Sequence, residues 1–282
     1  MHILIAEEVP LFFREALSGL GYQVDYQVDT NYEELRRIIE SYHGLVVRSN
    51  LSIDQAVISN GSNLRFIMRP GSGLDNVDLK AAQSAGIQVI SSPEGNRNAV
   101  GEHALSMLLS FYNNINPSFE GIKKSFWQRE VNRGHEVDGK TIGIIGYGNT
   151  GSAFAHKLKG FNANVLVYDK YHSYIESSNP NLTFSTYENI LEFADVISFH
   201  LPLNQDTSHY ANHQFFCQLG KAPLIINTSR GKIVDQQALL DALNNEKISG
   251  ACLDVLENEN LSNYTDIEKK WLDDVLATKK IL

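Results

Sequence analysis

Short apolar runs alternate with amphipathic stretches along almost the whole chain. A strand buried on both faces shows a short continuous apolar run, whereas a helix with one buried face repeats its apolar residues every three or four positions. Strands that alternate with helices are typical of βαβ units and parallel sheets, so the pattern predicts an α/β protein. Strands are predicted at 2–6, 44–47, 66–68, 88–90, 141–145, 165–168, 196–199, 224–227 and 251–254, and helices at 11–20, 99–115 and 236–243, the last capped by Asp235.

The helix predicted at residues 99–115 divides this pattern in two. Its stretch 104–109 is apolar on more than one face, which is typical of a helix buried on several sides at a domain or subunit interface. Residues 116–138, which include Trp127, are polar and are expected to be irregular. A second series of strands follows. We therefore expect two α/β domains with a boundary near the start of this helix.

Composition restricts the classes of function. The 282 residues include 24 Lys and Arg against 33 Asp and Glu, a net charge of −9, and an acidic chain repels nucleic-acid phosphates. No apolar stretch approaches the roughly 20 residues that span a bilayer, and the N-terminus turns acidic before a signal-peptide core could form. Cys217 and Cys252 make neither a disulfide framework nor a metal site. We expect a cytoplasmic protein without nucleic-acid, membrane or metal partners.

A glycine-rich turn follows the strand predicted at 141–145 and precedes a helical stretch. In such a turn the first glycine permits the tight bend, the second lets the backbone approach a pyrophosphate, and the third lets the helix pack closely on the sheet. The helix N-terminus then presents unpaired N–H groups to the phosphates. This context predicts a dinucleotide site rather than a turn that binds nothing. Its residues are Gly146, Tyr147, Gly148, Asn149, Thr150 and Gly151.

Asp169 ends the next predicted strand, 165–168. A carboxylate at this place accepts hydrogen bonds from the ribose hydroxyls of the adenosine, and it repels a 2′-phosphate. NAD is therefore expected rather than NADP. Lys170, which follows directly, weakens that preference slightly.

Arg230 follows the buried strand predicted at 224–227. Ligands of open α/β sheets bind at this edge, where the strands end. A guanidinium is costly to bury without an anionic partner, and its two parallel N–H donors match a carboxylate or a carboxylate with its adjacent carbonyl. The segment predicts recognition of an anionic substrate.

Several segments, in this order and spacing, resemble the D-2-hydroxyacid dehydrogenases, and within them the phosphoglycerate dehydrogenase and hydroxypyruvate reductase group. They are residues 71–78 (GSGLDNVD), 92–96 (SPEGN), 101–104 (GEHA), the glycine turn, 200–203 (HLPL), 227–235 (NTSRGKIVD) and 250–255 (GACLDV). The resemblance implies two doubly wound domains. A smaller flavodoxin-like substrate domain would occupy residues 1–95, and a Rossmann NAD-binding domain residues 96–282, with a dimerisation segment at 99–138.

The resemblance also implies roles for residues. Arg230 matches the arginine that holds the substrate carboxylate and carbonyl, and Glu259 the acid that orients a catalytic histidine. Asp254 matches the residue that contacts the nicotinamide amide, and Ser72 and Gly73 the loop that receives the substrate carboxylate. Positions that line the NAD site are matched by His200, Pro202, Thr207 and Thr228.

Three of these residues have a structural alternative. His200 could be a core histidine that only fastens a strand end. Asp254 could cap a helix or turn. Glu259 lies in the acidic run 257–260 and could be a solvated surface residue.

The expected reaction is reversible hydride transfer between C4 of the nicotinamide and C2 of a 2-oxo acid. The C2 oxygen needs a positive neighbour and a proton donor. In the family the donor is a histidine of a Pro-His pair, in a loop after the segment that residues 271–282 resemble, and this chain stops where that loop should begin. The helix that returns to the first domain is missing as well. We therefore expect a chain that binds NAD yet transfers hydride poorly.

Arginines beyond Arg230 favour a substrate with a phosphate as well as a carboxylate. Arg48 and Ser49 end a strand of the first domain, Arg69 precedes the loop with Ser72, and Arg129 matches an arginine that in relatives reaches a neighbouring subunit's cleft. Surface ion pairs are the alternative. We expect a 3-phosphoglycerate-like substrate and a homodimer. Hydroxypyruvate or glyoxylate reduction, and an NAD-sensing protein like the corepressors that share this fold, stay open.

Overall fold

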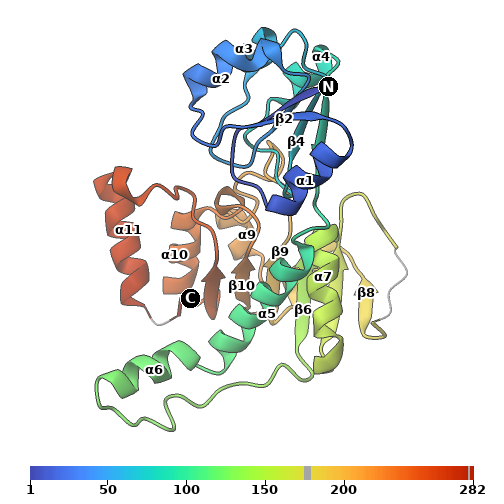
Figure 1. Ribbon diagram of the computed structural model, residues 1–282. Coiled ribbons are helices and arrows are strands. Elements are labelled where there is room, and N and C mark those ends of the chain that lie inside the picture. Colours follow the sequence, from blue (N-terminus) through green and yellow to red (C-terminus); the bar gives the residue numbers. More distant parts are fainter. Residues whose placement is uncertain (175–178, 279) are drawn as a thin grey trace. The chain divides into compact units, whose positions relative to one another are not determined.

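The computed structural model describes residues 1–174, 179–278 and 280–282. The chain divides into two compact units, Met1–Asn96 and Arg97–Leu282 (Figure 1). Each unit contains its own parallel sheet with helices on both faces.

The first unit contains a five-stranded sheet in the order β2-β1-β3-β4-β5. Each neighbouring pair of strands is parallel. This order is that of flavodoxin-like folds, as predicted. The strands are β1 (His2–Ile5), β2 (Gln23–Tyr26), β3 (Gly44–Val46), β4 (Phe66–Arg69) and β5 (Gln88–Ser91).

Successive side chains of β1 enter different cores, because neighbouring residues of a strand point to opposite faces. Ile3 and Ile5 join one apolar cluster with Leu17, whereas Leu4 joins another with Leu35. The first cluster is covered by α1 (Leu11–Gly19). The second is covered by α2 (Tyr32–Ile38), the 3-10 turn η1 (Ile39–Ser41), α3 (Gln55–Asn60) and α4 (Leu79–Ser84).

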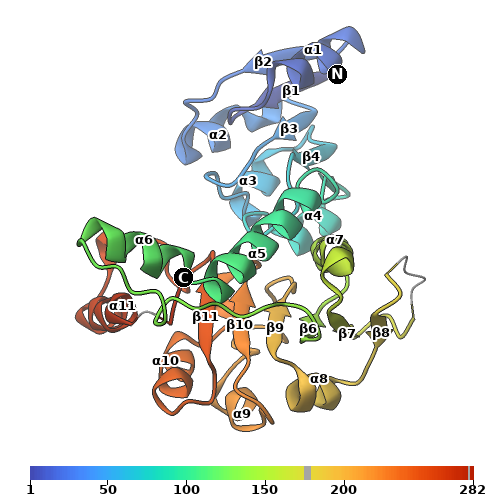
Figure 2. The same cartoon turned by 90° about the horizontal axis from the view of Figure 1, so that it is seen from below.

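The second unit contains a six-stranded parallel sheet in the order β11-β10-β9-β6-β7-β8 (Figure 2). This order is that of Rossmann folds. A parallel bridge between Ala251 and Ile281 continues the sheet beyond β11. The strands are β6 (Thr141–Ile145), β7 (Asn164–Tyr168), β8 (Leu182–Phe184), β9 (Val196–Phe199), β10 (Leu224–Asn227) and β11 (Gly250–Leu253).

Helices cover both faces of this sheet, so both units are doubly wound as predicted (Figure 2). One face carries α5 (Arg97–Tyr112) and α7 (Asn149–Lys157). The other carries α8 (Tyr187–Phe193), α9 (His213–Cys217) and α10 (Gln236–Asn244), which Asp235 caps by accepting from the Ala238 N–H. The remaining elements are α6 (Ile115–Lys123), α11 (Asp266–Ala277), and the 3-10 turns η2 (Leu158–Phe161), η3 (Gly231–Ile233) and η4 (Leu261–Asn263).

The prediction of irregular structure throughout residues 116–138 was wrong. The long helix ends at Tyr112, Asn114 takes a left-handed conformation (φ 51°), and α6 then starts at Ile115. Pro117 lies in the first turn of α6, where its missing N–H costs no helical hydrogen bond. The apolar residues of α6 recur at helical spacing, but all of them are exposed or half-buried.

Several further features bear on the class of protein. Cys217 is exposed and Cys252 is buried, and burial raises the pKa of the Cys252 thiol to about 12. Within residues 1–174, 179–278 and 280–282, no helix is long and apolar enough to cross a bilayer. The same residues contain no group of three or more histidine, cysteine or acidic side chains that could hold a metal ion.

Candidate dinucleotide and substrate sites

The second sheet has a topological switch point between β6 and β9. From β6 the chain continues to β7 and β8 on one side, whereas from β9 it continues to β10 and β11 on the other. The two loops that leave neighbouring strand ends therefore diverge, and ligands of open α/β sheets bind in the resulting crevice. The loops here are the glycine turn after β6 and the segment that starts at His200 after β9.

The three glycines of the turn meet different demands. Gly146 has a φ of 94°, and a Cβ there would lie 2.4 Å from the His200 carbonyl oxygen. A Cβ on Gly151 would lie 2.0 Å from the Gly146 carbonyl oxygen. Both contacts involve backbone atoms, so no side chain fits. By contrast, a Cβ on Gly148 would meet nothing within 4 Å. The space beside Gly148 leaves the backbone accessible to a ligand.

The N-terminus of α7 faces this turn without a side-chain cap. Gly148 is the N-cap residue, and Asn149 and Thr150 form the first turn. The first N–H groups of a helix have no partner within the helix, and the helix dipole makes this end partly positive. A phosphate fits such an end.

Asp169 is held by four donors just beyond β7. One carboxylate oxygen accepts from the Tyr147 N–H (2.7 Å), and the other from the N–H groups of Tyr171 (2.8 Å) and His172 (3.1 Å) and from the His172 ring (3.1 Å). Burial alone would raise the pKa of Asp169, but these donors outweigh it and keep the pKa below its usual value. The carboxylate is thus ionised and fixed beside the glycine turn.

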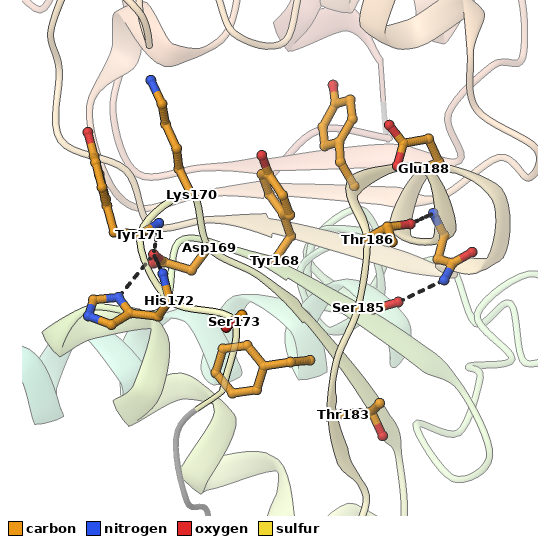
Figure 3. A pocket seen from close by; sticks show the side chains of 13 residues that line it. Tyr168, Asp169, Lys170, Tyr171, His172, Ser173, Thr183, Ser185, Thr186 and Glu188 are labelled. Carbon is orange, nitrogen blue, oxygen red and sulfur yellow. Dashed lines mark hydrogen bonds and ion pairs between the residues drawn. The ribbon is translucent and has the colours of Figure 1, made fainter.

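A hollow of about 820 Å³ opens beside Asp169, between the ends of β7 and β8 and the start of α8 (Figure 3). Asp169 points toward His172, whereas the Lys170 side chain extends away from it (Figure 3). Lys170 instead pairs with Asp206 (2.9 Å), in the loop after β9. Lys170 was expected to weaken the preference for NAD, and this pair offsets part of its charge.

Arg230 lies in a tightly folded loop after β10. The Asn227 side chain donates to the Arg230 carbonyl (2.9 Å) and accepts from the Ser229 N–H (3.1 Å) and hydroxyl (2.8 Å). A Cβ on Gly231 would lie 1.8 Å from the Leu256 carbonyl oxygen. The guanidinium of Arg230 donates to the Ser229 carbonyl (2.7 Å). These contacts fix the Arg230 backbone at the carboxyl edge of the sheet.

Thr228 shares this loop and has an unmatched hydroxyl. The side chain is buried, and in the described part of the chain its Oγ1 has no hydrogen-bond partner. Buried polar atoms are nearly always satisfied by protein, water or ligand. The unmatched Thr228 hydroxyl, the open backbone at Gly148 and the ionised Asp169 together fit a dinucleotide laid across the strand ends.

Asp254 follows β11 and pairs with His103 of α5 (3.1 Å). Glu259 is exposed. The neighbouring Glu257, rather than Glu259, contacts a histidine, His209 (3.3 Å), and accepts from the Gln236 N–H.

Pro202 and Thr207 lie in the loop after β9. The Thr207 hydroxyl donates to the Pro202 carbonyl (2.6 Å) and accepts from the Asn204 N–H (2.9 Å). These bonds close the loop on itself, so the structure shows a local structural role for Thr207.

The first unit places Arg48, Ser49 and Arg69 together at the carboxyl edge of its own sheet. The buried Glu7 carboxylate accepts from the N–H groups of Arg48 (2.6 Å) and Asn50 (3.0 Å). The Arg69 side chain donates to the Arg48 carbonyl (2.9 Å). A hollow of about 370 Å³ is lined by Glu7, Glu8, Val28, Arg48, Ser49 and Asn50.

The loop that follows β4 carries Ser72 and Gly73, both half-buried. It is tied to β5 because the Gly71 N–H donates to the Ser92 hydroxyl (3.1 Å) and the Ser92 N–H to the Gly71 carbonyl (3.0 Å). Arg129 belongs to the second unit and is exposed in the segment after α6.

Several partners of the predicted site residues had not been predicted from the sequence. They are His172 for Asp169, Asp206 for Lys170 and His103 for Asp254. His103 belongs to the segment 101–104 (GEHA), which gave a usable signal. His172 and Asp206 lie in loops without a motif.

Comparison with known proteins adds independent findings. Residues 105–278 match the family model described as D-isomer specific 2-hydroxyacid dehydrogenase, NAD binding domain. The chain is 33% identical over 281 residues to a D-3-phosphoglycerate dehydrogenase of Archaeoglobus fulgidus, covering all of this chain but only 53% of that protein. It is 32% identical over 271 residues to a hydroxypyruvate reductase of Thermotoga maritima, covering 95% of this chain and 88% of that protein.

Among solved structures, a glyoxylate reductase from Paecilomyes thermophila superposes with a TM-score of 0.87 at 24% identity, over 100% of this chain and 87% of that one. At this identity the likeness concerns the fold. The chain spans about half the length of the D-3-phosphoglycerate dehydrogenase that it matches.

Proposed function

The chain belongs to the D-isomer specific 2-hydroxyacid dehydrogenase family, and from that premise we propose that it takes part in NAD-dependent interconversion of a D-2-hydroxy acid and a 2-oxo acid. The observation that carries this proposal is the glycine turn with its ionised Asp169. Its backbone is fixed by main-chain contacts, the Tyr147 N–H donates to Asp169, and the space beside Gly148 is open.

The residues of the second unit divide the work of binding the dinucleotide. The N-terminus of α7 holds the pyrophosphate, and Asp169 accepts from the ribose hydroxyls, which disfavours a 2′-phosphate. Thr228 and Asp254 contact the nicotinamide end. When bound, NAD supplies the hydride acceptor, and NADH the donor.

Arg230 acts on the substrate. Its guanidinium holds the carboxylate and stabilises the negative charge that develops on the C2 oxygen. Glu259 is assigned to orient the proton-donating group, on the strength of the family resemblance. The described hydrogen bonds and ion pairs include none between Glu259 and a histidine.

Binding and turnover test this function separately. Isothermal titration should give tighter binding of NAD than of NADP. With NADH and a panel of 2-oxo acids, Arg230→Gln should lower kcat/KM by about 10²–10³-fold, because a donor to the developing charge is lost. Lys232→Gln removes an exposed charge two residues away and should leave kcat/KM nearly unchanged. Absence of dinucleotide binding, or equal turnover of D- and L-hydroxy acids, would contradict the proposal.

We further propose a substrate that carries a phosphate as well as a carboxylate, such as 3-phosphoglycerate. The support is Arg48 and Arg69 at one edge of the first unit's sheet, with Ser49, Ser72 and Gly73 beside them, and the name of the Archaeoglobus relative. Arg129 is included only because it matches an arginine that in relatives reaches a neighbouring subunit's cleft. Arg48→Gln should lower the affinity for 3-phosphoglycerate at least tenfold more than the affinity for glycerate. Arg65→Gln is the matched control, because Arg65 lies just before the start of β4 and so at the opposite edge of the sheet. Equal affinity for glycerate and 3-phosphoglycerate would favour hydroxypyruvate reduction, the function named for the Thermotoga relative.

We propose that a second copy of the chain covers the apolar surface of α6 and the segment after it. Six apolar side chains of this surface are more than half exposed: Ile115, Phe119, Ile122, Phe126, Trp127 and Val131. Exposed apolar patches of this kind mark association surfaces. Sedimentation equilibrium should find a dimer that Trp127→Ser weakens. Tyr174→Ser removes an equally exposed ring elsewhere and should not. A wild-type monomer at micromolar concentration would contradict this.

A further inference from the structure

Three polar side chains form a chain of hydrogen bonds from the interior of the second unit to the glycine turn. Ser198 Oγ lies 2.9 Å from His200 Nε2, and His200 Nδ1 lies 3.3 Å from Thr150 Oγ1. Ser198 is completely buried and His200 is 7% exposed, whereas Thr150 is half-buried in the first turn of α7. This series of hydrogen bonds thus ends at the N-terminus of α7, whose N–H groups are assigned to the pyrophosphate.

The position of the imidazole proton follows from the partners of Ser198. In the described part of the chain, His200 Nε2 is the only hydrogen-bond partner of the Ser198 hydroxyl. If Nε2 carried the proton, the Ser198 hydroxyl hydrogen would be buried without an acceptor, which costs about 1–3 kcal/mol. Ser198 therefore donates to Nε2, and the proton of the neutral ring lies on Nδ1.

This tautomer determines what Thr150 can do. Nδ1 donates to Thr150 Oγ1, so the hydroxyl oxygen accepts and its own hydrogen stays available. With the other tautomer, Thr150 would donate to Nδ1 and its hydrogen would be used inside the protein. Ser198, which does not itself reach the glycine turn, therefore decides which group donates and which accepts in both hydrogen bonds.

The ring has little freedom to turn away. The backbone N–H of His200 donates to the Ile145 carbonyl (2.9 Å), and the imidazole packs against Phe154 with 5.6 Å between ring centroids. A Cβ on Gly151 would lie 3.3 Å from the His200 Cβ. Burial also lowers the pKa of His200 to about 4, so the ring is neutral near neutral pH.

We propose that His200 is a positioning residue whose Nδ1–H, directed by Ser198, orients the Thr150 hydroxyl to donate to a pyrophosphate oxygen of the cofactor. This inference rests on the proposed function in one respect, that the ligand is a dinucleotide. In this proposal His200 neither contacts the cofactor directly nor serves only as a core histidine, but acts on the cofactor through Thr150.

A double-mutant cycle with ADP-ribose tests the proposal, because residues that act through one hydrogen-bond chain are not additive. Thr150→Val keeps the shape but loses the donor, and should weaken ADP-ribose about tenfold, the loss of a hydrogen bond to a charged group. Ser198→Ala should weaken it about three- to tenfold. In the Thr150→Val background, Ser198→Ala should have no further effect, and Thr150→Ser should restore affinity.

Adenosine separates this role from a merely structural one. It carries no phosphate, so its weaker binding should be the same in wild type, Thr150→Val and Ser198→Ala. If Ser198→Ala weakens adenosine as much as ADP-ribose, or weakens ADP-ribose equally in both backgrounds, the proposal is wrong.

The ring proton can also be located without any variant. The ¹⁵N chemical shifts of His200 in the wild-type chain should show a protonated Nδ1 and an unprotonated Nε2. A proton on Nε2 would overturn the proposal even if dinucleotides bind. Conversely, a chain that binds neither NAD nor ADP-ribose contradicts the proposed function, and the ¹⁵N spectrum still decides the tautomer.

Discussion

The two sheets of this chain present their carboxyl edges in different ways. In the second unit, main-chain contacts fix the glycine turn, and the two side chains beside it, Asp169 and His200, are largely buried, with 11% and 7% exposed. In the first unit the main chain is also fixed, by Glu7, but Arg48 and Ser49 project exposed side chains from it. A buried, rigid edge suits one invariant ligand, whereas exposed side chains on a fixed backbone can be exchanged to suit different substrates. This agrees with the different substrates named for the relatives.

The largest expected effect concerns the glycine turn, residues 146–151, at the carboxyl edge of the second unit's sheet. Gly151→Ala would place a Cβ against the Gly146 carbonyl oxygen, where neither backbone can move without disturbing β6 or α7. We expect a loss of about 3 kcal/mol or more in the free energy of unfolding, measured by urea denaturation.

Gly148→Ala is the matched control, because the same methyl group meets open space there. The free energy of unfolding of this variant should stay within about 1 kcal/mol of the wild-type value. Its affinity for NAD should fall instead, since the methyl group occupies the approach to the pyrophosphate. Equal stability losses in the two variants would show that the turn is not rigid.

His200 gives the next largest effect, as a dependence of stability on pH. Its pKa is lowered to about 4 in the folded state, against a usual value of about 6.5. Between these values the unfolded chain takes up a proton that the folded chain does not, so stability falls as the pH falls. Over this window the contribution is roughly 3 kcal/mol.

His200→Gln removes that contribution. The difference in unfolding free energy between wild type and variant should therefore shrink by roughly 3 kcal/mol from pH 7 to pH 4. A difference that stays constant with pH would mean that the ring is solvated.

A smaller effect is expected at the edge of the first unit. Glu7→Gln replaces one carboxylate oxygen by an NH₂ group, which cannot accept from a backbone N–H. Loss of one charge-assisted bond should lower the free energy of unfolding by about 1.5–3 kcal/mol. Glu8→Gln changes the neighbouring, exposed carboxylate and should have almost no effect. Similar losses for both would mean that net charge, not the Arg48 and Asn50 N–H groups, decides stability here.

Features that a single short segment determines could be predicted from the sequence. The glycine turn was found because its backbone geometry admits only glycine at two positions, and the central strands because they are apolar on both faces. The edge strands β2 and β8 were missed, since polar residues interrupt their apolar runs and no residue of either strand is fully buried. Helix α6 was missed because it is short and only Ile115, Phe119 and Ile122 mark its helical spacing, and these side chains are more than half exposed.

Features that join distant segments could not be predicted in this way. The ion pairs of Lys170 with Asp206 and of Asp254 with His103 depend on which distant segments meet at the edge of the sheet. Strand order decides this, and strand order follows from packing rather than from any local pattern. The sequence therefore predicted candidate ligand-binding residues, but not the distant residues that contact them.

The smallest expected effect concerns the choice between NAD and NADP, at the ion pair beside Asp169. Lys170 follows Asp169 directly, yet it pairs with Asp206 from another loop. In Asp206→Asn the ammonium group loses this partner and can approach a 2′-phosphate beside Asp169. Exposed ion pairs contribute little because solvent screens them, so NADP affinity should rise only about two- to fivefold while NAD affinity stays constant. Glu188→Gln removes the same charge from another side chain that lines the hollow. If it raises NADP affinity equally, the effect is one of net charge and the Lys170–Asp206 pair has no role in cofactor selection.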